Sequence, residues 1–260
     1  MNRDILKNEF KCLLEKGMVS YGIWNGIPNT YVAEILAGSG FDWVLVDAEH
    51  GPFDFKSILL QVQVLSGYSV PVLVRPPVGD SVLIKQLLDI GVQNLLIPMV
   101  ETPEQARALV QAMRYPPHGI RGVGTALARA SRWNQIDNYI NRANEQMCLI
   151  VQVESAKGLD QLEAICQVEG VDGVFIGPSD LAASIGYLGK PTHPDMLHKI
   201  GEALALIHKC GKTAGVLALE TAIANHYIAK GARMIGVGAD TLMLAQSAQA
   251  IAQRFKSSSV

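Results

Sequence analysis

The sequence predicts an α/β protein, a single-domain (β/α)8 barrel spanning residues 1–260. Short apolar, β-branched runs recur eight times, and each is followed by polar or glycine residues and then by a helical pattern. Eight such units in about 250 residues match the size of this barrel. A doubly wound sheet is the rival fold, but eight units would make it wide and leave its edges to be explained.

The eight runs lack the alternation of apolar and polar residues that a strand with one wet face shows. They therefore suit parallel strands covered by helices, as in the wall of a barrel. In chain order, the expected strands are residues 21–24, 44–46, 72–74, 95–97, 149–153, 174–176, 214–217 and 234–237.

Several helices between these strands carry start and stop signals. The clearest has Thr102 as its N-cap, Pro103 at the first helical position and Gln105 as the capping-box partner, and it should reach about Met113. Three further helices are bounded by caps, prolines and glycines. They are expected from Asn29 or Thr30 to Gly38, from Asp80 or Ser81 to Gly91, and from Pro194 to Cys210 and Gly211.

Composition narrows the possible partners and compartment. The 22 Lys and Arg residues nearly balance 24 Asp and Glu residues, so no global field recruits nucleic acid or an anionic membrane. The four cysteines form no C-x-x-C pair, and the amino terminus carries charge where a signal peptide needs an apolar core. No apolar run approaches the roughly 18 to 20 residues of a membrane span. A cytoplasmic protein that binds neither nucleic acid nor membrane is expected.

One stretch, residues 114–147, breaks the strand and helix rhythm. It fits neither one strand nor one helix, and loops of this length in compact domains are usually functional or interfacial. It combines several arginines with Trp133 and Tyr139. Binding of an anionic substrate group, or packing against another subunit, explains this composition better than nucleic-acid binding does.

Ionisable residues gather at the carboxyl ends of the expected strands, which face the active site in a barrel of this kind. Glu154 and Asp180 lie at corresponding points of adjacent strands. Two carboxylates there could converge on one hard divalent cation such as Mg²⁺ or Mn²⁺. Helix capping by Asp180 and a dipole interaction of Glu154 explain the same spacing equally well.

A candidate base and a candidate anion-binding group lie at the second and third strand ends. His50 follows the acidic pair Asp47 and Glu49, where a carboxylate could orient the imidazole for general-base work, although a lone histidine is more often structural. Arg75 precedes two prolines, and its fixed guanidinium suits a carboxylate, a phosphate, an enolate oxygen or a salt bridge to a rim acid. No strand end carries a lysine, which argues against a Schiff-base mechanism and for a metal as electron sink.

Several segments resemble the HpcH/HpaI aldolase family, in matching order over nearly the whole chain. They are FDWVLVDAEH (41–50), RYPPHGIRG (114–122), GTALARASRW (124–133), LIVQVE (149–154) and VDGVFIGPSDL (171–181). The resemblance implies a metal-dependent class II aldolase that cleaves 4-hydroxy-2-oxo acids to pyruvate and an aldehyde. Segment 124–133 favours the branch acting on 4-hydroxy-2-oxoheptanedioate, which releases succinate semialdehyde, and the alternative is a 2-keto-3-deoxy sugar acid.

The resemblance also implies roles for individual residues. Glu154 and Asp180 should ligate a divalent cation, Mg²⁺, Mn²⁺ or Co²⁺, without an organic cofactor. His50, supported by Asp47, should be the base, and Arg75 should stabilise the enolate of pyruvate. The expected substrate contacts are Gln152, the backbone amides of Ser179 and Asp180, Trp24 and Leu217.

Three further expectations concern the rest of the chain. Arg121 is a candidate partner for a distal substrate carboxylate. Ala48 stands where members of the family often have glycine, and little consequence is expected because neither residue supplies a functional side chain. The resemblance implies a homohexamer, a dimer of trimers, in which the last helix is exchanged between subunits.

Three classes of function remain open from the residues alone. A metal-dependent pyruvate aldolase uses the rim of Asp47, His50, Arg75, Glu154 and Asp180. A phosphate-binding barrel isomerase is suggested by the glycine-rich segment 236–240, and a non-catalytic assembly module is the third class. The rim favours the aldolase, because so much charge is costly to bury in a scaffold with nothing to bind.

Overall fold

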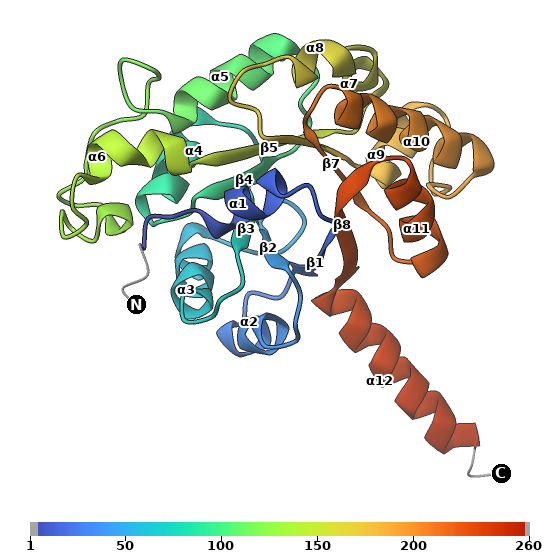
Figure 1. The fold of residues 1–260 in the computed structure, drawn as a ribbon. Coiled ribbons are helices and arrows are strands. Elements are labelled where there is room, and N and C mark those ends of the chain that lie inside the picture. Colours follow the sequence, from blue (N-terminus) through green and yellow to red (C-terminus); the bar gives the residue numbers. More distant parts are fainter. Residues whose placement is uncertain (1–4, 258–260) are drawn as a thin grey trace.

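The computed structural model describes residues 5–257, and the expected barrel is present. Eight parallel strands pair in chain order, and β8 pairs with β1 to close the barrel (Figure 1). The strands are β1 Ser20–Asn25, β2 Trp43–Asp47, β3 Val72–Arg75, β4 Asn94–Ile97, β5 Cys148–Val153, β6 Gly173–Ile176, β7 Thr213–Leu217 and β8 Ala232–Ala239.

The capping signals read from the sequence are confirmed. Thr102 and Gln105 form the predicted capping box at the start of α5, while Asn29 and Asp80 cap α2 and α4 with their side chains. Helices α1 to α6 are Glu9–Glu15, Thr30–Ala37, Phe55–Leu65, Ser81–Asp89, Pro103–Met113 and Tyr139–Arg142. Helices α7 to α12 are Ala156–Asp160, Leu162–Cys166, Pro178–Ser184, Pro194–Lys209, Thr221–Ala229 and Asp240–Ser257.

Large side chains fill the barrel interior, so it is a packed core and not a channel. Trp24 packs edge-on against Trp43, with ring centroids 5.7 Å apart, and is tilted against Phe175 at 5.6 Å. Glycines make room for these rings, since a side chain at Gly22 would overlap Trp43 and one at Gly215 would overlap Phe175. Polar side chains are therefore pushed to the two ends of the barrel.

Helix α1 covers the amino-terminal end of the barrel. Phe10 is fully buried and meets Trp43 edge-on at 6.4 Å. The buried Asn8 amide donates to Asn94 Oδ1 at 2.7 Å and to the Gln146 carbonyl at 2.8 Å. This end is therefore closed by α1, which leaves the carboxyl-terminal end for the site.

The irregular stretch, residues 114–147, contains only short helical pieces in addition to α6. Two 3-10 helices, η1 Arg129–Ser131 and η2 Ala143–Gln146, lie on either side of α6. At the other end of the chain, α12 projects away from the barrel (Figure 1). None of the helices in residues 5–257 combines the length and apolar character needed to cross a bilayer.

Candidate active site

Arg75 is the centre of the polar network at the carboxyl ends of the strands. It is the last residue of β3, opposite Asp47 in the register of β2. Its guanidinium donates to both Asp47 oxygens, from Nε to Oδ1 at 2.9 Å and from Nη2 to Oδ2 at 2.8 Å. Nη1 lies 2.9 Å from Glu49 Oε2 and donates to Gln152 Oε1 at 3.4 Å. One buried cation therefore links three strand ends.

Asp47 contacts His50 differently from the predicted arrangement. The Asp47 carboxylate accepts from the backbone amides of Glu49 and His50, at 3.2 and 3.4 Å, while Arg75 occupies both of its oxygens. Among the described residues, the acid beside the His50 imidazole is Glu49, whose Oε2 lies 3.8 Å from Nε2. Asp47 therefore holds the backbone of His50, and Glu49 is the side chain placed to orient the ring.

Glu154 is buried at the end of β5 and held by two neighbours. Gln152 Nε2 donates to Oε2, and the Met99 amide donates to Oε1 at 2.9 Å. Met99 adopts the left-handed conformation, with φ 54°, which is uncommon outside glycine and turns its amide toward the carboxylate. A side chain at Gly177 would overlap the Glu154 carboxylate. The left-handed backbone at Met99 directs an amide to the Glu154 carboxylate, and the absence of a side chain at Gly177 leaves space for it.

Helix capping does not account for the two predicted metal ligands. Ser155, not Glu154, caps α7, and its Oγ accepts from the Gly158 amide at 3.1 Å. Helix α9 has Gly177 at its N-cap and no side-chain cap, so Asp180 lies in the first turn without capping it. Side-chain capping by Asp180 is therefore wrong, whereas Glu154 directly precedes the N-cap of α7, so its interaction with that helix dipole stays open.

The rim carries four carboxylates, from Asp47, Glu49, Glu154 and Asp180, against the single guanidinium of Arg75. Burial raises the pKa of Glu154 and outweighs the hydrogen bonds from Gln152 and Met99, which lower it, while the nearby Asp180 charge adds to the rise. Burial also raises the pKa of Glu49, and it outweighs the opposing charge of Arg75 while the charges of Glu154 and Asp47 add to the rise. Burial opposes the charge of Arg75, but Asp47, Glu49 and Glu154 outweigh it and raise the pKa of that guanidinium. The site has an excess of negative charge.

Apolar side chains form the floor beneath this network. Trp24 is buried at the end of β1, and Leu217, at the end of β7, packs on the same cluster. A side chain at Gly236 would overlap the Trp24 ring. The two residues predicted to contact substrate therefore lie together, with a glycine of β8 leaving room for them.

The glycine-rich end of β8 is filled by a carboxylate of the chain itself. Asp240 is buried, and its oxygens accept from Asn25 Nδ2 at 2.9 Å and from the amides of Gly26, Ile27 and Thr241 at 2.8, 3.0 and 2.7 Å. These donors are the kind that would bind a phosphate, but they are already used. The phosphate-binding interpretation of residues 236–240 is therefore not supported.

Arg121 does not lie at the rim. Its side chain has no exposed surface, and Nη2 donates to Asp89 Oδ1 at 3.0 Å and to the Tyr139 hydroxyl at 3.3 Å. The guanidinium also lies over the Tyr115 ring, 4.4 Å from its centroid. Asp89 ends α4, just before the amino terminus of β4. The expectation that Arg121 binds a distal carboxylate does not hold, because the side chain is enclosed near the opposite end of the barrel.

Comparison with known proteins identifies the family. The family model described as HpcH/HpaI aldolase/citrate lyase matches residues 20–247. This chain belongs to the HpcH/HpaI aldolase family. It is 57% identical to the hydroxypyruvate/pyruvate aldolase of Deinococcus radiodurans, over 100% of this chain and 94% of that relative. It is 49% identical to the 4-hydroxy-2-oxo-heptane-1,7-dioate aldolase of Shigella flexneri, over 98% of this chain and 95% of the relative.

A solved structure agrees with this assignment. An HpcH/HpaI aldolase/citrate lyase family protein from Burkholderia cenocepacia J2315 superposes with a TM-score of 0.91 at 36% identity, covering 96% of this chain and all of the other. The family predicted from the sequence is confirmed. As an HpcH/HpaI aldolase, the protein is a carbon–carbon lyase of the pyruvate aldolase type.

Proposed function

We propose that this aldolase cleaves 4-hydroxy-2-oxo acids at the rim formed by Arg75, His50, Gln152, Glu154 and Asp180. The observation that carries the proposal is the position of Arg75, whose guanidinium is fixed by Asp47 and reaches Gln152 beside Glu154. A fixed cation next to a carboxylate pair suits a reaction in which negative charge develops on a ketone oxygen.

The donor set fits a divalent cation held by Glu154 and Asp180. Four carboxylates face one guanidinium, and the pKa of Glu154 is raised by burial and by Asp180, so a bound cation would relieve the excess charge. Among residues 5–257 no three His, Cys, Asp or Glu side chains form a metal-binding group. The proposed protein ligands are therefore limited to the two carboxylates of Glu154 and Asp180. A divalent cation bound there supplies Lewis-acid stabilisation of the oxygen that gains charge. Mg²⁺, Mn²⁺ and Co²⁺ are the candidates.

His50 acts as the base in cleavage. Its imidazole is largely exposed at the rim, with Glu49 Oε2 3.8 Å from Nε2. It removes the proton of the C4 hydroxyl, the electron pair of that O–H bond forms the aldehyde carbonyl, and the C3–C4 bond breaks. The C3–C4 electrons pass into the enolate of pyruvate, where Arg75 donates to the oxygen, and protonation at C3 completes the product. Condensation runs the same steps in reverse.

Pyruvate is held by the start of α9 and by the floor of the site. The first amides of a helix have no partner within the helix, so those of Ser179 and Asp180 are available to a carboxylate. Gln152 can donate to a substrate oxygen if it turns from Glu154. Trp24 and Leu217 provide the apolar surface beneath the methyl end.

The proposed substrate is 4-hydroxy-2-oxoheptanedioate, which yields pyruvate and succinate semialdehyde. This rests on relatives such as the Shigella flexneri enzyme at 49% identity. A second candidate is hydroxypyruvate used in place of pyruvate, because the relative at 57% identity carries that name. A 2-keto-3-deoxy sugar acid is the remaining alternative from the same family.

Pyruvate release coupled to lactate dehydrogenase separates these substrates. We expect the highest kcat/KM with 4-hydroxy-2-oxoheptanedioate, and detectable condensation of succinate semialdehyde with pyruvate. Faster condensation with hydroxypyruvate would assign the second candidate. A His50→Ala variant that kept full activity on every substrate would remove the proposed base.

A homohexamer, a dimer of trimers with α12 exchanged between subunits, completes the proposal. Support comes from α12 itself, which projects from the barrel (Figure 1). Several of its apolar side chains are exposed. They include Leu242, Met243, Leu244, Ile251 and Phe255. Exposed apolar surface on a projecting helix favours burial against another subunit. A cytoplasmic location stays a prediction, supported by four cysteines that are all free thiols.

A further inference from the structure

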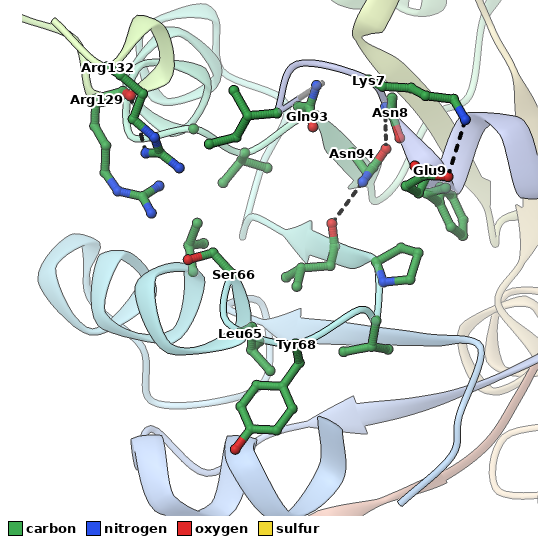
Figure 2. A pocket seen from close by; sticks show the side chains of 18 residues that line it. Lys7, Asn8, Glu9, Leu65, Ser66, Tyr68, Gln93, Asn94, Arg129 and Arg132 are labelled. Atoms are coloured by element: carbon green, nitrogen blue, oxygen red, sulfur yellow. Dashed lines mark hydrogen bonds and ion pairs between the residues drawn. The ribbon is translucent and has the colours of Figure 1, made fainter. Parts of the chain in front are cut away.

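A cavity lies beside α1, at the opposite end of the barrel from the aldolase rim. It has a volume of about 450 Å³ and is bounded by the chain before α1, the end of α3, the starts of β3 and β4, and η1 (Figure 2). This volume is within the range of small-molecule sites. Nothing in the aldolase reaction requires a cavity at this end.

Two guanidiniums face this cavity without an acidic partner among the described residues. Arg129 Nη1 donates to the Ile90 carbonyl at 2.8 Å, and Arg132 Nη1 makes a long hydrogen bond to the Arg129 carbonyl at 3.4 Å. Figure 2 shows both side chains on the same side of the cavity, away from Lys7 and Glu9. Glu9 is the one acid among the lining residues, and it lies 3.6 Å from Lys7.

The two like charges are held close together. Arg129 is half-buried, and burial lowers the pKa of its guanidinium, with the charge of Arg132 acting in the same direction. Arg132, Trp133 and Asn134 are consecutive non-glycine residues with positive φ, and the buried Ser131 hydroxyl accepts from the Asn134 amide at 3.0 Å. The loop therefore holds the backbone of Arg132, and the hydrogen bond to the Arg129 carbonyl at 3.4 Å keeps its guanidinium beside Arg129.

The neutral polar groups of the cavity are already engaged within the chain. Gln93 Nε2 donates to the Leu6 carbonyl at 2.7 Å, and Asn94 Nδ2 donates to the Val72 carbonyl at 2.9 Å. The spare donors are thus on the two arginines. Apolar side chains make up much of the remaining wall, and they include Val62, Leu65, Val70, Val72 and Val92.

We propose that this cavity binds a small organic anion, a carboxylate with an apolar chain. Its head group lies on Arg129 and Arg132, and its chain lies along the valines and Leu65. An arginine fork suits a carboxylate because it offers parallel N–H donors, and an anion removes the repulsion between two adjacent cations. The site is separate from the aldolase rim and does not depend on the proposed substrate.

Octanoate is the test ligand, and isothermal titration calorimetry with the full-length wild-type enzyme is the measurement. Mg²⁺ and saturating pyruvate are present throughout, so that the aldolase site is occupied. Acetate supplies the head group alone, and octanamide supplies the chain with a neutral head. We expect one octanoate per chain, bound at least tenfold more tightly than acetate or octanamide.

Two variants locate the site. Arg132→Gln removes one charged fork and should weaken octanoate binding at least tenfold. Arg129→Gln should also weaken octanoate binding at least tenfold. If loss of its hydrogen bond to the Ile90 carbonyl prevents folding, the result with Arg132→Gln alone tests the proposal. Arg107→Gln is the matched control, because Arg107 lies on the exposed face of α5 paired with Glu104 and should bind octanoate like wild type.

The proposal is overturned if octanoate does not bind, or binds no more tightly than octanamide. Equal affinity of the wild-type and Arg132→Gln proteins for octanoate would also overturn it. If a second copy of the chain covers the cavity, octanoate will not bind, and that result also contradicts the proposal.

Discussion

Arg75 and Asp47 form a buried, two-point ion pair across β2 and β3, with Nε to Oδ1 at 2.9 Å and Nη2 to Oδ2 at 2.8 Å. The pair leaves Nη1 of Arg75 directed at Glu49 and Gln152. Asp47 also accepts from the His50 amide at 3.4 Å. The position of the proposed base and of the enolate-binding cation therefore depends on one carboxylate.

Replacing Asp47 tests this dependence. Asp47→Asn keeps the shape but removes the charge, so Arg75 loses its two-point partner. Removing one partner of a buried pair costs roughly 3–5 kcal/mol, and because Glu49 also faces Arg75 we expect the free energy of unfolding to fall by about 3 kcal/mol. We also expect kcat to fall about 100-fold, since the cation is no longer fixed. Urea denaturation and the coupled pyruvate assay measure the two effects.

Asp54→Asn is the control for Asp47→Asn, because Asp54 caps α3 at an exposed position. It should leave kcat unchanged and lower the free energy of unfolding by about 1 kcal/mol or less. A Asp47→Asn enzyme with wild-type kcat would show that the position of Arg75 does not matter.

Gly177→Ala tests the space around Glu154. The added methyl group would overlap the Glu154 carboxylate, so we expect this side chain to move and metal affinity to fall about tenfold or more. Titration of the metal-free protein with Mn²⁺, followed by electron paramagnetic resonance, measures the affinity. Gly38→Ala is the matched control, because a methyl group there makes only ordinary contacts. Equal Mn²⁺ affinity in both variants would contradict the arrangement.

The raised pKa of Glu154 gives a prediction for stability against pH in metal-free protein. Because burial raises its pKa in the folded state, the folded chain binds the proton more tightly than the unfolded chain does. The free energy of unfolding contributed by this group therefore falls as pH rises from the ordinary glutamate pKa of 4.5 toward the raised pKa. Above that pKa, the buried, ionised Glu154 lowers the free energy of unfolding of the metal-free protein.

Glu154→Gln removes this titration. In EDTA, the free energy of unfolding of the wild type should fall, relative to Glu154→Gln, between pH 4.5 and neutral pH. Added Mg²⁺ should stabilise the wild type and leave the variant unchanged. Parallel pH profiles for the two proteins, with equal responses to Mg²⁺, would show that Glu154 neither bears this burial cost nor binds the cation.

The exposed apolar face of α12 gives a prediction for assembly. Leu244 is 63% exposed and Ile251 52% exposed, and their spacing of seven residues places them on one side of the helix. The double substitution Leu244→Asp and Ile251→Asp should reduce a hexamer to a smaller species, as measured by light scattering during gel filtration. Gln249→Asp is the control on the same helix. A wild-type protein that is monomeric would refute the assembly proposal outright.

Most of the fold could be predicted from the sequence because its signals are local. Each strand is a short apolar run, and residues such as Thr102 with Gln105 or Asp80 mark helix starts by side-chain bonds within one turn. The rim could be predicted for a related reason. Once the strand ends are known, the barrel brings together residues far apart in sequence, as it does for Asp47 and Arg75.

The remaining contacts of the site form only in the folded chain and have no local signal in the sequence. Met99 contributes a backbone amide through a left-handed conformation, which its side chain does not reveal. The sequence places Glu49 next to His50 but does not reveal its contact with Arg75, which forms only when β2 and β3 pair. The Asp240 carboxylate accepts hydrogen bonds from four donors, which come from both the beginning and the end of the chain. The sequence predicts that Arg121 contacts substrate, because its burial against Asp89 cannot be seen without the path of residues 114–147.

Metal-assisted cleavage at Glu154 and Asp180 requires that activity lost on metal removal returns when a metal is added. Pyruvate release from 4-hydroxy-2-oxoheptanedioate is measured on EDTA-treated enzyme before and after added Mg²⁺, Mn²⁺ or Co²⁺, for the wild type and Glu154→Gln. We predict that EDTA abolishes pyruvate release, that at least one cation restores it in the wild type, and that none restores it in the variant. Full release from the EDTA-treated wild type, or equal restoration in Glu154→Gln, would rule out metal-assisted cleavage at Glu154.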